Sequence, residues 1–208
     1  MSSEHIFLVL IQFSAFAFSI ILHEVAHGYA AYRMGDPTAA YSNRLTLNPL
    51  AHVDLIGTII VPLVLYTLNQ PILGWAKPVP INPYHFRNLK RGVMITAVAG
   101  PATNFALAVV AGLLSRGFPV TSIFCQFLAF LAGANVLLGV FNLIPIPPLD
   151  GSRILYGLLP RGIDDKYMRI EPIGIFIVYG LLATNVLSYT LFPLCGLIIT
   201  LLVGQRYM

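Results

Sequence analysis

The chain has 208 residues, of which 57% are hydrophobic and only 10% are charged, and its mean hydropathy is +0.81. Soluble domains carry about 25% charged residues, so this composition excludes an ordinary water-soluble globular protein. Lys and Arg outnumber Asp and Glu by 12 to 8, which gives a formal net charge of +4. We therefore expect an all-α polytopic membrane protein, with five to six apolar segments in the lipid bilayer.

Five apolar segments are long enough to cross a bilayer, which takes about 20 residues of helix. They are residues 6–33, 92–115, 119–145, 170–187 and 188–204. The last two are short and share a boundary, so we expect one of them to be tilted or partial.

Three further segments lie between the first two spans. Residues 55–69 are apolar but only 15 residues long, with a glycine and a proline near the middle, so we predict a re-entrant segment. Residues 36–54 place apolar residues amid polar ones, compatible with a short membrane-associated sheet whose edge pairs with an extended peptide. Residues 75–83 cannot be helical because their prolines recur too closely. They form either an interfacial loop anchored by Trp75 or a gate over a buried site.

The basic residues predict the orientation of the chain. Of the twelve Lys and Arg residues, all but Arg116 lie in connections that the five predicted spans place at one face. Positive charge marks the cytoplasmic face. We therefore expect a multi-pass protein of the cell membrane, with its N-terminus outside and its C-terminus in the cytoplasm. Re-entry of residues 55–69 follows from the same rule, because a true crossing there would carry four basic residues outside.

The first predicted span carries His23, Glu24 and His27 in the pattern His-Glu-x-x-His, within an otherwise uncharged stretch. A carboxylate near the centre of a membrane helix costs about 2.5–3.5 kcal/mol on insertion scales, so a compensating partner such as a metal ion is expected. Residues four apart share one face of a helix, so both imidazoles can reach one Zn²⁺. Glu24 would then take a proton from a water molecule. Six residues, roughly 9 Å, separate His27 from Arg33, which places the site nearer the cytoplasmic side.

A catalytic zinc ion needs a third protein ligand. Asp150 differs from the other acidic residues because it follows the prolines at which the helix 119–145 breaks. Membrane proteins tolerate such a break where protein or a water-filled cavity satisfies the freed backbone groups. From its position alone, Asp150 is either the third ligand or an ordinary helix cap. A fourth ligand from His52 would leave no place for water, so we expect His52 to form hydrogen bonds near the re-entrant turn.

Three elements in this order resemble the site-2 proteases, zinc metalloproteases that cut peptide bonds within the membrane. His-Glu-x-x-His is the first, Gly100-Pro101-Ala102-Thr103-Asn104 is similar to the family's Gly-Pro-x-x-Asn, and residues 142–151 read Asn-x-x-Pro-x-Pro-x-Leu-Asp-Gly. The resemblance implies a three-helix catalytic core formed by the first three spans. It also implies one Zn²⁺ per chain, with His23, His27 and Asp150 as ligands and Glu24 as the catalytic base.

Asn142 and Asn104 belong to the second and third of these elements. Amide groups at membrane depth need hydrogen-bond partners. Each asparagine either contacts the substrate or the oxyanion of the reaction, or makes a hydrogen bond between helices.

The resemblance implies an endopeptidase that hydrolyses peptide bonds in transmembrane segments of membrane proteins, with the lipid bilayer around it and no nucleic-acid partner. We expect one domain over 1–208, with a catalytic core at about 6–160, a helical hairpin at about 170–204 and no PDZ or CBS domain. The alternatives are a divalent-metal transporter and a non-catalytic membrane scaffold. Against a transporter, the chain shows no pair of matching halves with interrupted helices, which many transporters have. A non-catalytic scaffold would require altered motif residues, and the motif residues are intact.

Overall fold

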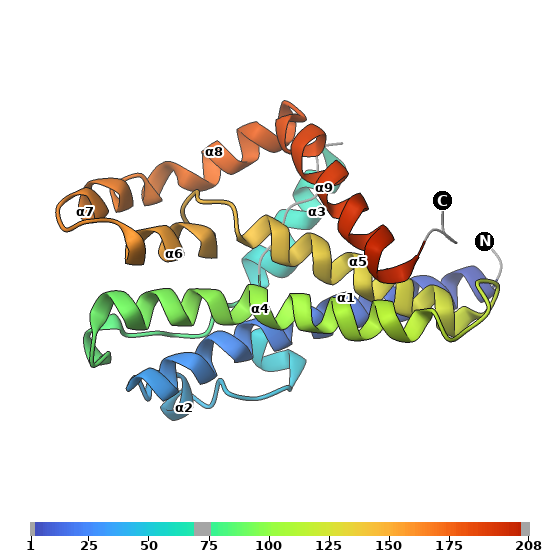
Figure 1. Ribbon diagram of the computed structural model, residues 1–208, viewed down its shortest axis with the longest axis horizontal. Helices are drawn as coiled ribbons and strands as arrows, with labels where there is room; N and C mark the ends of the chain where they lie inside the picture. The colour runs from blue at the N-terminus through green and yellow to red at the C-terminus, as the bar shows by residue number, and fades with distance from the viewer. Residues whose placement is uncertain (1–2, 69–75, 205–208) are drawn as a thin grey trace.

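The computed structural model describes residues 3–68 and 76–204 (Figure 1). Four of its helices are long and apolar enough to cross a membrane: α1 (Ser3–Met34), α4 (Leu89–Ser115), α5 (Ile123–Asn142) and α9 (Val186–Val203). The prediction of a helical multi-pass membrane protein is therefore confirmed. Within the described residues, however, four segments reach spanning length, instead of the expected five to six.

The remaining helices are shorter. They are α2 (Thr38–Tyr41), α3 (Val61–Thr67), α6 (Asp150–Leu158), α7 (Ile163–Met168) and α8 (Glu171–Ala183), with single turns of other helix types at Pro49–His52, Leu55–Ile60 and Pro83–His85. The predicted span 170–187 corresponds to α8, whose 13 residues reach about 20 Å, less than the hydrocarbon core. It ends early because Asn185 adopts a left-handed conformation with φ of 59° and turns the chain into α9.

The sheet predicted within residues 36–54 is wrong, because this stretch forms α2 and the 3-10 turn Pro49–His52. Local hydrogen bonds explain the difference. The buried Asp36 carboxylate accepts from the Thr38 backbone N–H at 3.0 Å, and the Asn48 side chain accepts from the Leu50 N–H at 3.1 Å. Such bonds satisfy backbone groups locally, where a strand would need a neighbour.

The apolar segment 55–69 is helical over its described part. The Asp54 carboxylate accepts from the Gly57 N–H at 2.7 Å and caps the first turn, which continues into α3. Residue 69 lies outside the described residues, and re-entry into the membrane stays a prediction.

The core is built from α1, α4 and α5, which lie side by side (Figure 1). Small residues let these helices approach closely, as is usual for packing in a membrane. Ala108 of α4 is fully buried against Val136 and Val140 of α5, and Cys195 of α9 closes the same cluster. The α5 helix ends part-way along α4, so that the following loop and α6 complete the bundle at that end (Figure 1).

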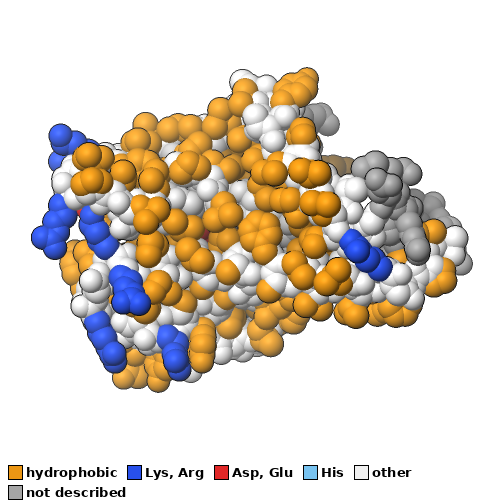
Figure 2. Space-filling model, in the orientation of Figure 1, with side chains coloured by type: hydrophobic (Ala, Val, Ile, Leu, Met, Phe, Trp, Pro, Cys, Tyr) orange, Lys and Arg blue, Asp and Glu red, His pale blue; other side chains and the backbone are white. Residues whose placement is uncertain are grey.

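Lys and Arg side chains gather at the end of the molecule that carries α6, α7 and the start of α4, while apolar side chains cover most of the remaining face (Figure 2). Arg116, in the turn between α4 and α5, lies at the other end. Its Nε donates to the Leu202 carbonyl of α9 at 2.8 Å, and Nη2 donates to the Leu201 carbonyl. The last turn of α9 therefore lies at the same end as the start of α1 (Figure 1), which differs from the expected placement at opposite faces. The cause is the short α8: together with α9 it makes a single passage along the bundle.

Candidate metal centre

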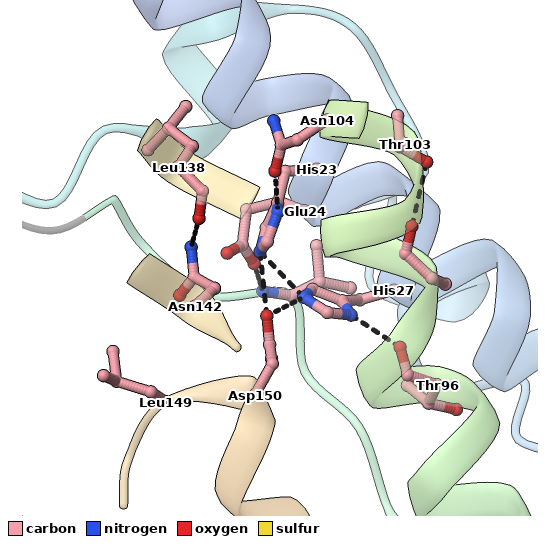
Figure 3. A network of polar contacts seen from close by, with 12 residues as sticks. His23, Glu24, His27, Thr96, Thr103, Asn104, Leu138, Asn142, Leu149 and Asp150 are labelled. Atoms are coloured by element: carbon pink, nitrogen blue, oxygen red, sulfur yellow. Dashed lines mark hydrogen bonds and ion pairs between the residues drawn. The ribbon is translucent and has the colours of Figure 1, made fainter. Parts of the chain in front are cut away.

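The side chains of His23 and His27 on α1 meet that of Asp150 at the start of α6 (Figure 3). The two Nε2 atoms are 2.9 Å apart, and each lies 3.2 Å from Asp150 Oδ2. Within the described residues this is the one group of three or more His, Cys, Asp or Glu side chains whose ligand atoms come within 4.8 Å of one another. Tetrahedral zinc ligands at their usual bond lengths lie roughly 3.3 Å apart. The three atoms therefore have the spacing of ligands to one metal ion.

The outer nitrogen of each imidazole is held by an oxygen. His23 Nδ1 lies 2.6 Å from Asn104 Oδ1, and His27 Nδ1 lies 2.7 Å from the Thr96 carbonyl oxygen. Both oxygens are acceptors, so each Nδ1 carries the proton and donates it. This tautomer leaves the lone pairs of both Nε2 atoms directed toward Asp150.

The Asp150 Oδ2 atom is buried and has no hydrogen-bond donor within the described residues. Two nitrogen lone pairs and a carboxylate oxygen gathered without a proton between them repel one another. A cation resolves this repulsion, and Zn²⁺ takes imidazole nitrogen and carboxylate oxygen as ligands. The side chains present therefore fit the metal that the sequence predicts.

Two glycines allow the elements of this site to approach closely. A Cβ atom at Gly100 of α4 would lie 2.6 Å from His23 Cε1 and closer still to the His27 ring, so only glycine leaves room for the imidazoles. A Cβ at Gly151 would come within 2.6 Å of the Ile144 carbonyl oxygen in the loop before α6. That loop interrupts the helix after α5, because its prolines cannot continue a helix. The interruption lets α6 begin beside α1, which places Asp150 opposite the two histidines.

A cavity of about 370 Å³ opens beside the three side chains. Its wall includes Glu24, Asn142 and Arg153 together with apolar side chains of α4 and of the segment 76–83. The Glu24 carboxylate lies at this wall and accepts a hydrogen bond from the Val79 backbone N–H at 3.0 Å. A carboxylate beside the proposed metal ligands, inside a cavity, is suitably placed for proton transfer.

Residues 76–82 form no helix and run along the cavity, as the prolines predict, while Trp75 lies outside the described residues. The guanidinium of Arg44 donates to the carbonyl oxygens of Lys77 at 2.7 Å and Pro78 at 3.1 Å. Near the other end of the segment, the Asn82 N–H donates to Asp36 at 2.7 Å. Hydrogen bonds therefore hold the segment on both sides of Val79, the residue that contacts Glu24.

The two asparagines of the sequence motifs lie in different surroundings. Asn104 is fully buried, and its Nδ2 donates to Asn135 Oδ1 at 2.8 Å while its Oδ1 contacts His23. This position behind His23 favours the hydrogen bond between helices over a contact with substrate. Asn142 lines the cavity, and its Nδ2 donates to the Leu138 carbonyl at 3.0 Å. His52 takes no part in the group, because its Nε2 donates to the Thr46 carbonyl at 2.9 Å.

Sequence reasoning missed two polar residues behind the site. Asn135 of α5 and Ser19 of α1 are both fully buried, and Asn135 Nδ2 lies 2.9 Å from Ser19 Oγ. The available signal was the one that pointed to Asn104, namely an amide inside an apolar membrane helix, which requires a polar partner. Ser19 also lies one helical turn before His23, on the same face.

Comparison with known proteins finds metalloproteases. Residues 117–184 match the model of peptidase family M50. YwhC of Bacillus subtilis, named as a zinc metalloprotease, is 36% identical over 185 residues, covering 85% of this chain and 81% of the relative. Rip2 of Mycolicibacterium smegmatis, named likewise, is 33% identical over 85% of this chain and 68% of its own length. The zinc metalloprotease MJ0392 of Methanocaldococcus jannaschii is 25% identical over 81% of this chain and 42% of its own length. No solved structure matches the chain.

These likenesses extend over most of the chain, beyond the short motifs that first suggested the family. The chain belongs to peptidase family M50, the zinc-dependent site-2 proteases, and is a membrane metalloendopeptidase.

Proposed function

We propose that this protease hydrolyses peptide bonds inside the transmembrane segments of other membrane proteins, with Zn²⁺ held by His23, His27 and Asp150. One observation supports this above all: the three ligand atoms converge within 4.8 Å, and two of them come from the middle of a membrane-spanning helix. His23 precedes the end of α1 at Met34 by 11 residues, roughly 17 Å. Half the hydrocarbon thickness is about 15 Å. A substrate that reaches the site is therefore inside the membrane.

The chemistry divides between the ion and the side chains around it. When bound, zinc supplies a Lewis acid that polarises a carbonyl group and lowers the pKa of a coordinated water toward ~7. Glu24 serves as the base that takes the proton of the attacking water and returns it to the leaving nitrogen. The hydrogen bond from Val79 holds the Glu24 carboxylate at the cavity wall for this role. Asn142, on the same wall, is assigned to hydrogen bonding with the substrate backbone or the developing oxyanion.

The substrate must expose a backbone carbonyl at the cavity. In a transmembrane helix each carbonyl is hydrogen-bonded and shielded, so the segment has to unwind locally before cleavage. Glycine or proline near the cleaved bond makes such unwinding easier. We accordingly assign membrane proteins with helix-breaking residues in their spans as the substrate class.

The basic end of the molecule is assigned to the cytoplasm by the distribution of Lys and Arg. The start of α1 and the end of α9 would then face the outer side, with the metal centre nearer the cytoplasm. Residues 1–208 act as one protease domain in this proposal, with the core at about 6–160 and with α8 and α9 added as one further passage along the bundle.

The test is cleavage of a membrane-embedded reporter by the full chain purified in detergent and returned to vesicles. Glu24→Gln should keep zinc and lose cleavage, because the amide cannot accept the proton. Asp165→Asn, at an exposed position of α7, makes a comparable change away from the cavity and should cleave as the wild type does. Appreciable cleavage by Glu24→Gln would remove Glu24 from the role of base. Cleavage of an unfolded soluble peptide but not of the embedded reporter would instead contradict the membrane substrate.

A further inference from the structure

We propose that Asn135 of α5 is a positioning residue that fixes the ring proton of His23, acting through Asn104. This inference rests on the proposed role of His23 as a metal ligand. It concerns a third helix of the core, one that contributes no ligand of its own.

The contacts form a closed path through all three core helices. Ser19 and His23 lie one turn apart on α1, Asn135 lies on α5, and Asn104 lies on α4. Asn135 Nδ2 contacts Ser19 Oγ at 2.9 Å, Asn104 Nδ2 contacts Asn135 Oδ1 at 2.8 Å, and His23 Nδ1 contacts Asn104 Oδ1 at 2.6 Å.

Two backbone carbonyls fix the direction of every hydrogen bond in this path. Asn135 Nδ2 also lies 2.9 Å from the Leu131 carbonyl oxygen, and Ser19 Oγ lies 2.9 Å from the Ala15 carbonyl oxygen. A carbonyl only accepts, so the serine hydroxyl must donate to Ala15 and the NH₂ group of Asn135 must face Leu131 and Ser19. The remaining atom of that amide, Oδ1, is then an acceptor directed at Asn104.

The orientation of the Asn104 amide follows from that of the Asn135 amide. An acceptor at Asn135 Oδ1 requires the NH₂ group of Asn104 on that side, which turns the Asn104 carbonyl oxygen toward His23. His23 must then carry its proton on Nδ1 and present the lone pair of Nε2 to Asp150. A reversed Asn104 would direct N–H groups at Nδ1 and force the proton onto Nε2, where it would occupy the metal-facing position.

Burial makes this dependence strong. Ser19, Asn104 and Asn135 are each 0% exposed, so water cannot replace a missing partner. His27 provides the contrast within the same site, because its Nδ1 is held by the backbone carbonyl of Thr96 and needs no side chain. Of the two histidines, His23 is therefore the one whose orientation depends on Asn135.

The experiment measures zinc affinity by chelator competition on the full chain in detergent. Asn135→Leu should weaken zinc binding by about 10–100-fold, the usual effect of losing a side chain that orients a metal ligand. Asn104→Leu should do the same. In the double variant, Asn135→Leu should cause no loss beyond that of Asn104→Leu, because it acts through that residue. Gln126→Leu, which removes an exposed amide from the same helix, should bind zinc as the wild type does.

A purely structural role for Asn135 gives a different result. In that case Asn135→Leu would lower the melting temperature of the zinc-free chain but leave the zinc affinity within about twofold of wild type. Alternatively, it would weaken zinc binding by the same factor in the Asn104→Leu background as in the wild type. Either result overturns the proposal. If Asn135→Leu fails to fold, Ser19→Ala decides: a loss of about two- to tenfold, as for one buried hydrogen bond, supports the proposal, and wild-type affinity overturns it. His23→Ala in the same series tests the metal site itself, since unchanged zinc binding there contradicts the proposed function independently of Asn135.

Discussion

Gly100 of α4 lies directly against the imidazole of His27, so closely that a Cβ atom at position 100 would overlap the ring. The neighbouring His23 Cε1 would lie only 2.6 Å from that atom. The glycine of the Gly-Pro-x-x-Asn element therefore contributes by having no side chain. The space left free is where the two histidines turn toward Asp150.

Replacing this glycine tests that relationship. Gly100→Ala should displace one or both imidazoles and weaken zinc binding by about tenfold or more, since overpacking costs ~1–3 kcal/mol. Gly196→Ala is the matched control, because it also lies in a membrane helix and its added Cβ meets no atom within 4 Å. Zinc affinity of both variants by chelator competition is the measurement. Equal affinities would show that the imidazoles do not depend on the close approach of α4.

The hydrogen bond from Val79 to Glu24 should matter for the rate and not for the metal. Val79→Pro removes the N–H that the carboxylate accepts, so we expect kcat to fall roughly tenfold, as for a hydrogen bond to a charged group. Val79→Ala keeps the N–H and shortens the side chain, which separates the backbone effect from packing. Zinc content and reporter cleavage are measured on both. A Pro variant as active as the Ala variant would remove the Val79 contact from the mechanism.

Acid should loosen the contact between the start of α4 and α7. Lys90 Nζ donates to Asp164 Oδ2 at 2.5 Å, and this hydrogen bond holds the pKa of Asp164 below its ordinary 3.8. A lowered pKa in the folded state means that the pair stabilises the fold above about pH 4, and that this contribution disappears as the pH falls through the lowered value.

The measurement for this pair is the melting temperature as a function of pH. Asp164→Asn should melt below the wild type at pH 7, and the difference should shrink as the pH falls below about 4. Asp165→Asn, at the exposed neighbouring position, should follow the wild type throughout. A difference between Asp164→Asn and wild type that stays constant from pH 7 to pH 3 would contradict the ion pair as its source.

Features that depend on local spacing could be predicted from the sequence. The placement of His23 and His27 on one helical face follows from their separation by four residues, and the long apolar runs give the spanning helices directly. The approach of Asp150 is different, because α1 and α6 are far apart in the chain and spacing alone left an ordinary helix cap open. There the family resemblance supplied the information.

Other features depend on contacts between residues that no sequence pattern predicts. Hydropathy is similar on both sides of Asn185, yet the left-handed turn at that residue separates a short α8 from a spanning α9. The end of α9 therefore lies at the same end of the bundle as the start of α1 (Figure 1). The hydrogen bonds of Asp36 convert a predicted strand region into turns. The path from Ser19 to His23 through Asn135 and Asn104 joins three helices, and only their packing shows which amide faces which partner.

The claim on which the account depends is that side chains from α1 and α6 hold one metal ion, and zinc stoichiometry measures it most directly. The purified chain should contain one zinc per molecule, and Asp150→Ala should contain nearly none, with X-ray absorption of the wild type showing two imidazoles and a carboxylate oxygen around the metal. Asp165→Asn serves as the control for the loss of a carboxylate elsewhere. A full equivalent of zinc in Asp150→Ala, with unchanged absorption, would contradict the account.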